Sequence, residues 1–283
     1  MHIFVTGATG FIGSHFVRLA INSGHQVSAL KRDKLSKPKI SWPKDPHWIE
    51  SSILDLKAEH LQGVNAIVHF AAAGVSPRTA TWQELEKVNV HSTLYLCELA
   101  KLIGSCISIS GSFAEYGLSG NRFSLIPPSA PLEPTFPYAA SKAASSVLAT
   151  SFARFEGIQL TYLRIFNAYG DGQFEGNLWP SLRSAALSGE NFPLTPGEQI
   201  RDFIDVETVA KWFLASINTN IQRPKEPLVL NVGSGNPQTI SNFCQYWWKE
   251  WSASGKLEIG ALPYRKGEVM RYVPEINHSL FEL

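Results

Sequence analysis

Tyr138 and Lys142 stand four residues apart and form the pair of side chains in this sequence best suited to proton transfer. On a helix this spacing puts both side chains on one face. A free tyrosine has a pKa near 10, and a neighbouring ammonium lowers it by favouring the phenolate. We therefore expect Tyr138 to exchange a proton with a hydroxyl–carbonyl pair while a hydride moves. Lys142 assists it and can also hold the ribose hydroxyls of a nicotinamide cofactor.

A glycine-rich turn near the N-terminus predicts a site for a dinucleotide. Three glycines follow the first apolar run at intervals of three residues and precede a helical pattern. In such a turn the first glycine allows the sharp bend, the second lets the pyrophosphate approach the backbone, and the third permits close helix–strand packing. The helix N-terminus attracts the phosphates. The residues expected to contact the cofactor here are Gly7, Thr9, Gly10, Phe11, Ile12 and Gly13.

The end of the second predicted strand bears on which dinucleotide is bound. NAD-binding proteins place an Asp or Glu there to hold the ribose 2′-hydroxyl. Here the strand ends in Lys31 and Arg32, and Asp33 follows immediately. Two cations suit the additional 2′-phosphate of NADP. The sequence thus favours NADP(H), with NAD(H) possible and an exposed basic loop as the alternative interpretation.

Short apolar runs alternate with helical patterns through the first two-thirds of the chain. Strands are predicted at 3–6, 26–30, 66–70, 106–110 and 159–165, and helices at 11–23, 82–102 and 138–155. Strands that are apolar on both faces, separated by helices, predict an α/β fold: a Rossmann-type, doubly wound parallel sheet.

The pattern loosens after this region, which predicts a smaller C-terminal substrate lobe. Residues 168–200 are rich in Gly, Pro and Asn, and a helix at 206–217 and a strand at 228–232 follow. We expect the strand to return to the main sheet. The predicted division is a dinucleotide-binding domain at 1–166 with later returns near 205–235, and a substrate-binding lobe at 167–204 and 236–283.

These motifs together resemble the extended short-chain dehydrogenase/reductase family, the nucleotide-sugar epimerases, dehydratases and 4-ketoreductases. The Gly7-x-x-Gly10-x-x-Gly13 and Tyr138-x-x-x-Lys142 motifs are its hallmarks, and the resemblance covers most of the chain. It implies that Ser112, in the segment 110–117, is the catalytic hydroxyl and that Asn89 helps to order a proton relay. The further cofactor contacts that it implies are Asp55, Leu56, Phe70, Ala71, Ala72, Ser110 and Phe166.

The same resemblance implies a nucleoside-diphosphate sugar as substrate, held in the smaller lobe. The residues at the corresponding positions are Asn167, Asn177, Arg201, Arg265 and Glu268, besides Ser112. Two guanidinium groups match the charge and fork geometry of a diphosphate. The chain ends sooner than the family pattern, which usually continues with a Gly-Trp-x-Pro segment.

Three reactions compete within this family. Its dehydratases carry Asp-Glu directly after the catalytic hydroxyl, where this chain has Phe113 and Ala114, neither of which can move a proton. A 4-epimerase keeps NAD tightly bound, as in UDP-glucose 4-epimerases, whereas a 4-ketoreductase exchanges NADPH. Because of Lys31 and Arg32, we expect an NADP(H)-dependent reductase of a nucleoside-diphosphate-4-keto-6-deoxyhexose, with the 4-epimerase as the alternative. A non-catalytic dinucleotide-binding module is disfavoured by the presence of Ser112, Tyr138 and Lys142.

Composition limits the partners and the compartment. A net charge of +1 over 283 residues argues against nucleic acid, and the apolar runs are too short for a membrane span. Three widely spaced cysteines and no basic leader predict a cytoplasmic protein, and no metal site is expected. The helices at 82–102 and 138–155 resemble those of the family's four-helix dimer interface. The apolar residues expected on their outer faces are Leu94, Leu96, Val147 and Leu148.

Overall fold

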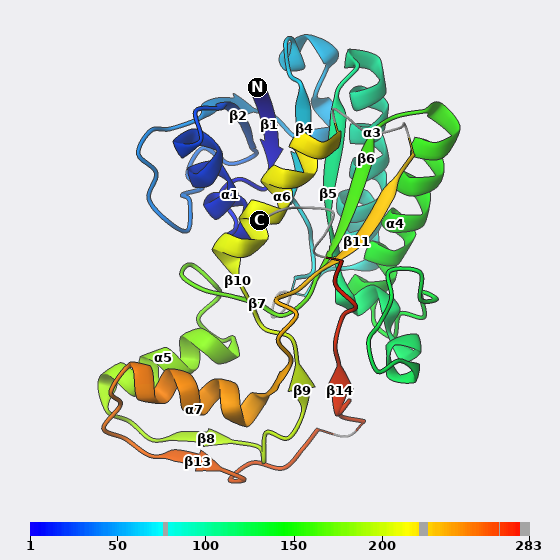
Figure 1. The fold of residues 1–283 in the computed structure, drawn as a ribbon. Coiled ribbons are helices and arrows are strands. Elements are labelled where there is room, and N and C mark those ends of the chain that lie inside the picture. The colour runs from blue at the N-terminus through cyan, green and yellow to red at the C-terminus, as the bar shows by residue number, and fades with distance from the viewer. Residues whose placement is uncertain (76–78, 221–225, 266, 278–283) are drawn as a thin grey trace.

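A seven-stranded parallel sheet forms the centre of the protein, as predicted (Figure 1). The structure, a computed structural model, describes residues 1–75, 79–220, 226–265 and 267–277. The strands lie in the order β11-β6-β5-β4-β1-β2-β3. Their bounds are β1 (His2–Thr6), β2 (Gln26–Lys31), β3 (His47–Glu50), β4 (Ala66–His69), β5 (Cys106–Ser112), β6 (Leu160–Ile165) and β11 (Leu228–Val232). The order reverses at β1 and β4, as in a Rossmann-type sheet.

Helices cover both faces of this sheet. Helices α1 (Phe11–Asn22) and α6 (Val206–Asn220) lie on one face, and α3 (Ser92–Ile103) and α4 (Pro137–Glu156) lie on the other. The first face is packed with Phe16, Trp212 and Phe213, and the second with Leu96 and Tyr162. Burial on both faces explains why the strand sequences are apolar almost throughout.

Two local elements differ from the expectation. The edge strand β3 was not predicted, because it is half-exposed and its sequence lacks a clear apolar run. The predicted helix at 82–102 is divided into α2 (Trp82–Leu85), a π-helical turn η3 (Glu86–His91) and α3. Such turns widen a helix locally and are frequent at functional sites. Here the widened turn carries Asn89, whose side chain is buried.

Segments after β6 build a second group of elements below the main sheet in Figure 1. They are β7 (Ala168–Tyr169), α5 (Leu178–Ser188), β8 (Phe192–Leu194), β9 (Ile200–Arg201), β10 (Ile204–Asp205), β12 (Gln238–Thr239), α7 (Ile240–Glu250), β13 (Leu257–Ile259) and β14 (Arg271–Tyr272). Aromatic rings dominate its core, where Phe203 and Phe243 stack with centroids 3.9 Å apart and Trp179 meets Trp247 edge-on. The strand β11 instead pairs in parallel with β6 of the main sheet.

The outer faces of α3 and α4 are only partly as expected. Val147 and Leu148 are exposed, and Phe155 at the end of α4 is 88% exposed. Leu96, in contrast, is fully buried among the residues between α3 and the sheet, so its assignment to an outer apolar surface was wrong. Six residues further along α3, Leu102 is exposed. No helix within the described ranges is long and apolar enough to cross a membrane.

Candidate active site

The glycine turn links β1 to α1 and leaves no room for a side chain at Gly7 or Gly13. Gly7 has φ +70°, and a Cβ there would lie 2.6 Å from the backbone nitrogen of Ala71. A Cβ on Gly13 would lie 2.2 Å from the carbonyl oxygen of Gly7. Helix α1 begins after Gly10, which has no side chain that could cap the helix. The backbone N–H groups of the first turn, which begins with Phe11 and Ile12, therefore receive no side-chain cap. This turn fits a bound pyrophosphate, with Thr9 half-buried beside it.

The predicted contacts to the adenosine half lie at the ends of neighbouring elements. Arg32 is exposed directly after β2, whereas the ammonium of Lys31 lies 4.9 Å from the ring centroid of Trp48 on β3. Asp55 is exposed in the short 3₁₀ helix η1 (Ile53–Asp55). Leu56 is fully buried, and its carbonyl oxygen accepts a hydrogen bond from a tyrosine of α3. Its side chain therefore serves the core, and only its backbone could reach a cofactor.

The segment after β4 lies against the glycine turn. Phe70, Ala71 and Ala72 are half-buried there, and the backbone of Phe70 and Ala71 is what a Cβ on Gly7 would strike. Directly before them, His69 is completely buried between the hydroxyls of Thr6 (2.6 Å) and Thr93 (3.1 Å). Burial, with Lys142 nearby, lowers the pKa of His69 to about 3, so the imidazole is neutral. It fixes the ends of two strands beneath the candidate cofactor site.

Asn89 is 1% exposed and ties three segments together. Its side-chain amide oxygen accepts a hydrogen bond from the Ala73 N–H at 2.8 Å. Its amide nitrogen donates to the Ala73 carbonyl oxygen at 3.1 Å and to the Ser141 hydroxyl at 2.8 Å. Since Ser141 precedes Lys142 on α4, Asn89 connects the loop after β4 with the helix that carries the candidate catalytic pair.

Ser112, Tyr138 and Lys142 come together at the carboxyl end of β5. Tyr138 and Lys142 lie in the first two turns of α4, as predicted, and the Ser112 side chain lies close enough to the Tyr138 phenol to lower its pKa. The Lys142 ammonium is 1% exposed and donates a hydrogen bond to the carbonyl oxygen of Ser110. The three groups thus share one site, at the strand ends that face the glycine turn.

The protonation of this pair differs from the expectation. The pKa of Tyr138 is raised to about 12, because burial disfavours the phenolate and the Glu115 carboxylate adds a second negative charge. The nearby Ser112 side chain lowers the pKa of Tyr138 and so opposes this shift only in part. Burial also lowers the pKa of Lys142 to about 8, against the raising effect of Glu115. The predicted lowering of the tyrosine pKa by the ammonium is therefore wrong for the protein without ligands, where Tyr138 is a neutral phenol.

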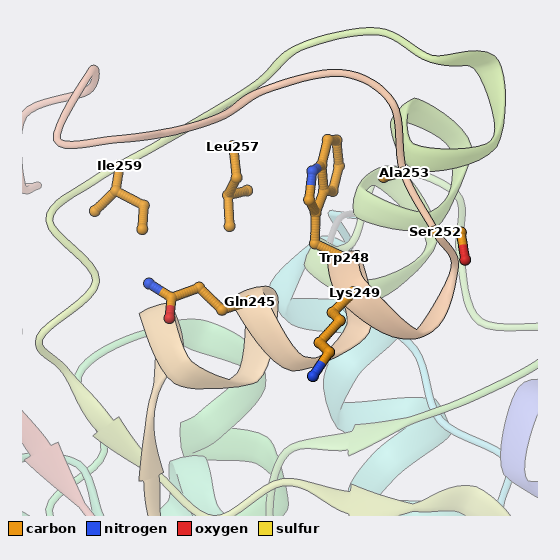
Figure 2. A pocket seen from close by; sticks show the side chains of 7 residues that line it. All are labelled: Gln245, Trp248, Lys249, Ser252, Ala253, Leu257 and Ile259. Atoms are coloured by element: carbon orange, nitrogen blue, oxygen red, sulfur yellow. The ribbon is translucent and has the colours of Figure 1, made fainter.

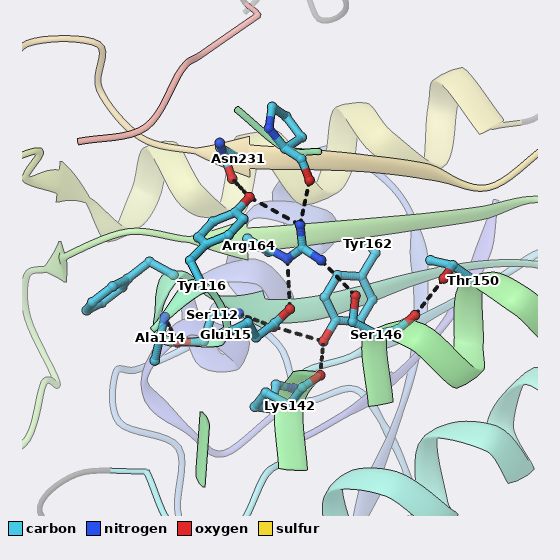
Figure 3. Close-up of polar contacts among 12 residues, drawn as sticks. Ser112, Ala114, Glu115, Tyr116, Lys142, Ser146, Thr150, Tyr162, Arg164 and Asn231 are labelled. Atoms are coloured by element: carbon cyan, nitrogen blue, oxygen red, sulfur yellow. Dashed lines mark hydrogen bonds and ion pairs between the residues drawn. The ribbon is translucent and has the colours of Figure 1, made fainter. Parts of the chain in front are cut away.

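A buried ion pair lies next to Ser112 and Lys142 and was not predicted (Figure 3). The Arg164 Nε donates to Glu115 Oε2 at 2.7 Å, and both side chains are almost completely buried. Arg164 is the penultimate residue of the buried strand β6, where a charged residue requires a partner. That position was the signal in the sequence, because a continuous apolar strand rarely contains an unpaired arginine.

Phe166 lies in an aromatic cluster next to Ser112. Its ring is 1% exposed and packs against Phe113, with centroids 5.5 Å apart, and against Tyr116 and Tyr272. The Tyr272 hydroxyl lies 3.3 Å and 3.2 Å from the carbonyl oxygens of Phe113 and Gly117. Strand β14 therefore contacts the loop that carries Ser112. The place of Phe166 at a nicotinamide stays a prediction.

The residues predicted to bind substrate lie along the junction with the smaller group of elements. Asn167 follows β6 and donates to the carbonyl oxygen of Asp202 at 3.0 Å, and Asn177 is the N-cap residue of α5. Arg201 on β9 pairs with Glu268 at 3.2 Å, so two predicted ligands hold each other. Arg265 is exposed.

A separate depression lies on the smaller group of elements, away from this constellation. It is lined by side chains of α7 and β13, with Trp248 and Leu257 among them (Figure 2). None of its lining residues belongs to the predicted catalytic or ligand-binding set. It therefore takes no part in the candidate site.

The chain belongs to the NAD dependent epimerase/dehydratase family, whose profile matches residues 3–233. A curated relative, the dTDP-glucose 4,6-dehydratase of Streptomyces niveus, is 27% identical over 96% of this chain and 84% of the relative. The dTDP-6-deoxy-L-talose 4-dehydrogenase (NAD(+)) of Aggregatibacter actinomycetemcomitans is 26% identical, over 95% of this chain and 98% of the relative.

Solved structures agree with this assignment. The UDP-N-acetylglucosamine 4-epimerase from Methanobrevibacter ruminantium M1, in complex with UDP-N-acetylmuramic acid, superposes with a TM-score of 0.83. It is 26% identical, and the match covers 98% of this chain and 90% of that one. The fold thus agrees with the family, and the similar proteins named here are epimerases, dehydratases or dehydrogenases of nucleotide sugars.

Proposed function

We propose that the protein is a nicotinamide-dependent 4-ketoreductase of a nucleoside-diphosphate-4-keto-6-deoxyhexose. The observation that carries the proposal is the grouping of Ser112, Tyr138 and Lys142 at the carboxyl end of β5, where the raised pKa of Tyr138 keeps the phenol protonated. A reductase needs a proton donor in its resting state, whereas the first step of a 4-epimerase removes a proton from the sugar hydroxyl. A neutral tyrosine suits the donor role.

The proposed reaction uses three side chains of this chain. When bound, the reduced nicotinamide supplies the hydride. The Ser112 hydroxyl orients the C4 carbonyl oxygen of the sugar, and Tyr138 gives its proton to that oxygen as the alcohol forms. Lys142, almost completely buried beside the same strand end, stabilises the resulting phenolate by its charge until solvent returns a proton.

The dinucleotide would lie on the glycine turn and along the ends of β2 and β4. We propose NADP(H) over NAD(H), on the basis that Arg32 is exposed after β2 and that no carboxylate precedes Asp33 at that strand end. Lys31 has the weaker claim, since its ammonium already lies over Trp48. The relative from Aggregatibacter actinomycetemcomitans has NAD(+) in its name. The preference of this protein between NADP(H) and NAD(H) therefore has to be measured.

A 4-epimerase with retained NAD is the second candidate. It is supported by the likeness to the 4-epimerase of Methanobrevibacter ruminantium. Dehydration has less support: Phe113 is packed in the aromatic cluster and Ala114 is buried, so neither position offers an acid or a base.

The test is turnover of NADPH and NADH with dTDP-, GDP-, CDP- and UDP-linked 4-keto-6-deoxyhexoses. We expect the reduced cofactor to be oxidised in the presence of at least one of these sugars, and faster for NADPH than for NADH. The preference for NADPH should be smaller in Arg32→Ala. Tyr138→Phe should lose roughly 10³-fold in kcat with cofactor affinity kept, whereas the exposed Tyr246→Phe should match the wild type. Interconversion of UDP-hexoses without net cofactor oxidation would replace this proposal by the epimerase.

We also propose a homodimer formed by α3 and α4 in a reducing, cytoplasmic setting. The exposed Leu102, Val147 and Phe155 support an apolar contact between copies. Three buried cysteines, none of them in a disulfide, support the compartment. A monomer mass in sizing chromatography would contradict the dimer.

A further inference from the structure

One buried carboxylate, that of Glu115, holds the loop that carries Ser112. We call residues 110–117 the serine loop. Glu115, in this loop, is 0% exposed, and its Oε1 accepts a hydrogen bond from the Ser112 backbone N–H at 2.7 Å. Its second oxygen accepts from Arg164 Nε at 2.7 Å. Both carboxylate oxygens thus accept hydrogen bonds inside the protein, and one of them holds the backbone of Ser112, the candidate catalytic hydroxyl residue (Figure 3).

Arg164 connects the serine loop to the catalytic helix. Its NH2 group donates to the Ser146 hydroxyl at 3.0 Å, one turn beyond Lys142 on α4. Its NH1 group donates to the Tyr116 hydroxyl at 3.1 Å and to the Pro128 carbonyl oxygen at 2.8 Å. The planar guanidinium fork can satisfy these directions together, which an ammonium could not.

Tyr162 links the two catalytic segments through its hydroxyl group. Its hydroxyl lies 3.0 Å from Glu115 Oε1 and 3.0 Å from the backbone carbonyl oxygen of Lys142. One phenol proton is therefore shared between the serine loop and α4. Figure 3 shows the ring of Tyr162 between these groups, below Arg164.

The backbone at Gly111 is shaped to allow this arrangement. A Cβ at that position would lie 2.3 Å from Tyr162 Cε1 and 2.9 Å from Glu115 Oε1. The serine loop therefore passes directly over the ring and the carboxylate, without a side chain between them. This close approach is a second, independent sign that the network and the loop fit each other.

We propose that Glu115, Arg164 and Tyr162 are positioning residues, which hold Ser112 in register with Tyr138 and Lys142. They would touch neither substrate nor cofactor, and they act on the reaction proposed above through the placement of these three groups. Misplacement of a reacting group by about 1 Å can cost about 10²-fold in rate. The network should therefore control kcat far more than the binding of sugar or dinucleotide.

The negative charge of Glu115 also affects the titration of the two catalytic groups, which a purely structural role would not require. Glu115 raises the pKa of both Tyr138 and Lys142. In Glu115→Gln both groups should lose their protons at lower pH. Since the proposed reduction needs a protonated Tyr138 and a charged Lys142, the alkaline fall of kcat should move to lower pH.

The experiment compares Glu115→Gln and Tyr162→Phe with Glu133→Gln, which removes a carboxylate from an exposed arginine pair. Tyr162→Phe keeps the ring and the ion pair, so it tests the link even where Glu115→Gln fails to fold. Kinetics with the 4-keto sugar that the wild type reduces should show kcat lowered about 100-fold in Glu115→Gln and about tenfold in Tyr162→Phe, with KM within about threefold. Glu133→Gln should match the wild type.

Each result decides the proposal. A kcat within twofold of the wild type in both variants would overturn it. So would a fall in kcat that is matched by a rise in KM and a fall in the folded fraction, with an unchanged pH profile. If the wild type reduces none of the sugars, the proposed function fails separately. Amide hydrogen exchange at Ser112 then decides: faster exchange in Tyr162→Phe than in Glu133→Gln supports positioning, and equal exchange overturns it.

Discussion

The proposed catalytic end of the main sheet and the proposed substrate side of the molecule are built in opposite ways. At the strand ends, Lys142, Glu115 and His69 are buried, and each has partners inside the protein. On the substrate side, Arg201 and Glu268 pair with each other in a partly exposed contact, and Arg265 is exposed. The first region is organised before any ligand arrives. The second has polar groups that a ligand could take over.

This difference separates chemistry from specificity. Preorganised groups in a dry site stabilise developing charge at little reorganisation cost, which suits a reaction common to many sugars. An exposed arginine such as Arg265 costs little to redirect, which suits a surface that adapts to one nucleotide. The two regions should therefore respond differently to substitution and to pH, and three measurements test this.

The largest effect is expected from acid, through His69 on the catalytic side. Its pKa is lowered to about 3 by burial, against an ordinary 6.5. Between these values the unfolded chain binds a proton that the folded protein does not, so stability rises with pH and is lost on acidification below about 6.5. The contribution is at most about 5 kcal/mol. Urea unfolding at several pH values should show it.

A matched pair of variants attributes this acid sensitivity. His69→Gln should flatten the dependence of the unfolding free energy on pH between about 6 and 4. His25→Gln, which removes a histidine at the opposite end of the strands, should leave most of the slope in place. If the pH dependence of the unfolding free energy flattened equally in both variants, the acid sensitivity would not come from His69 in particular. The contrast between the two sides of the molecule would then be weaker.

The second effect concerns the backbone of the glycine turn. Gly7→Ala meets both a left-handed φ and the backbone of the β4 end, and it should cost at least about 2 kcal/mol of stability or abolish dinucleotide binding. Gly24→Ala has a similar φ of +79° with nothing within 4 Å, so it should cost only about 1 kcal/mol. Thermal unfolding and dinucleotide titration compare them, and equal losses would show that strain rather than contact governs the turn.

Much of the catalytic side could be predicted from the sequence, because its residues occupy fixed places on regular elements. The glycine spacing located the turn, and the Tyr138–Lys142 spacing located one helix face. The protonation of Tyr138 could not be predicted, because it depends on burial and on Glu115, which approaches from another segment. Leu96 was misplaced for a related reason: an apolar residue on a helix does not reveal whether its face meets the sheet or the outside.

The substrate side was harder to predict because its partners come from distant parts of the chain. Arg201 and Glu268 were each expected to hold a ligand, and the sequence gives no sign that they hold each other across 67 residues. The π-helical turn at Asn89 was hidden in the same way, since its helix has the ordinary apolar pattern. Contacts set by tertiary packing leave no periodic trace.

The smallest effect is expected on the substrate side. Arg201→Gln should raise the KM for the sugar nucleotide about tenfold with kcat within about threefold, because a diphosphate would lose one charged partner while the buried catalytic groups stay in place. The exposed Arg265→Gln should raise KM less than Arg201→Gln, since its side chain needs ordering before it can contribute. Steady-state kinetics at two salt concentrations separate the two, because screening weakens the exposed charge more. A fall in kcat for Arg201→Gln comparable with its rise in KM would mean that this arginine also places the sugar for reaction, and the division between a chemical and a specificity region would no longer hold at β9.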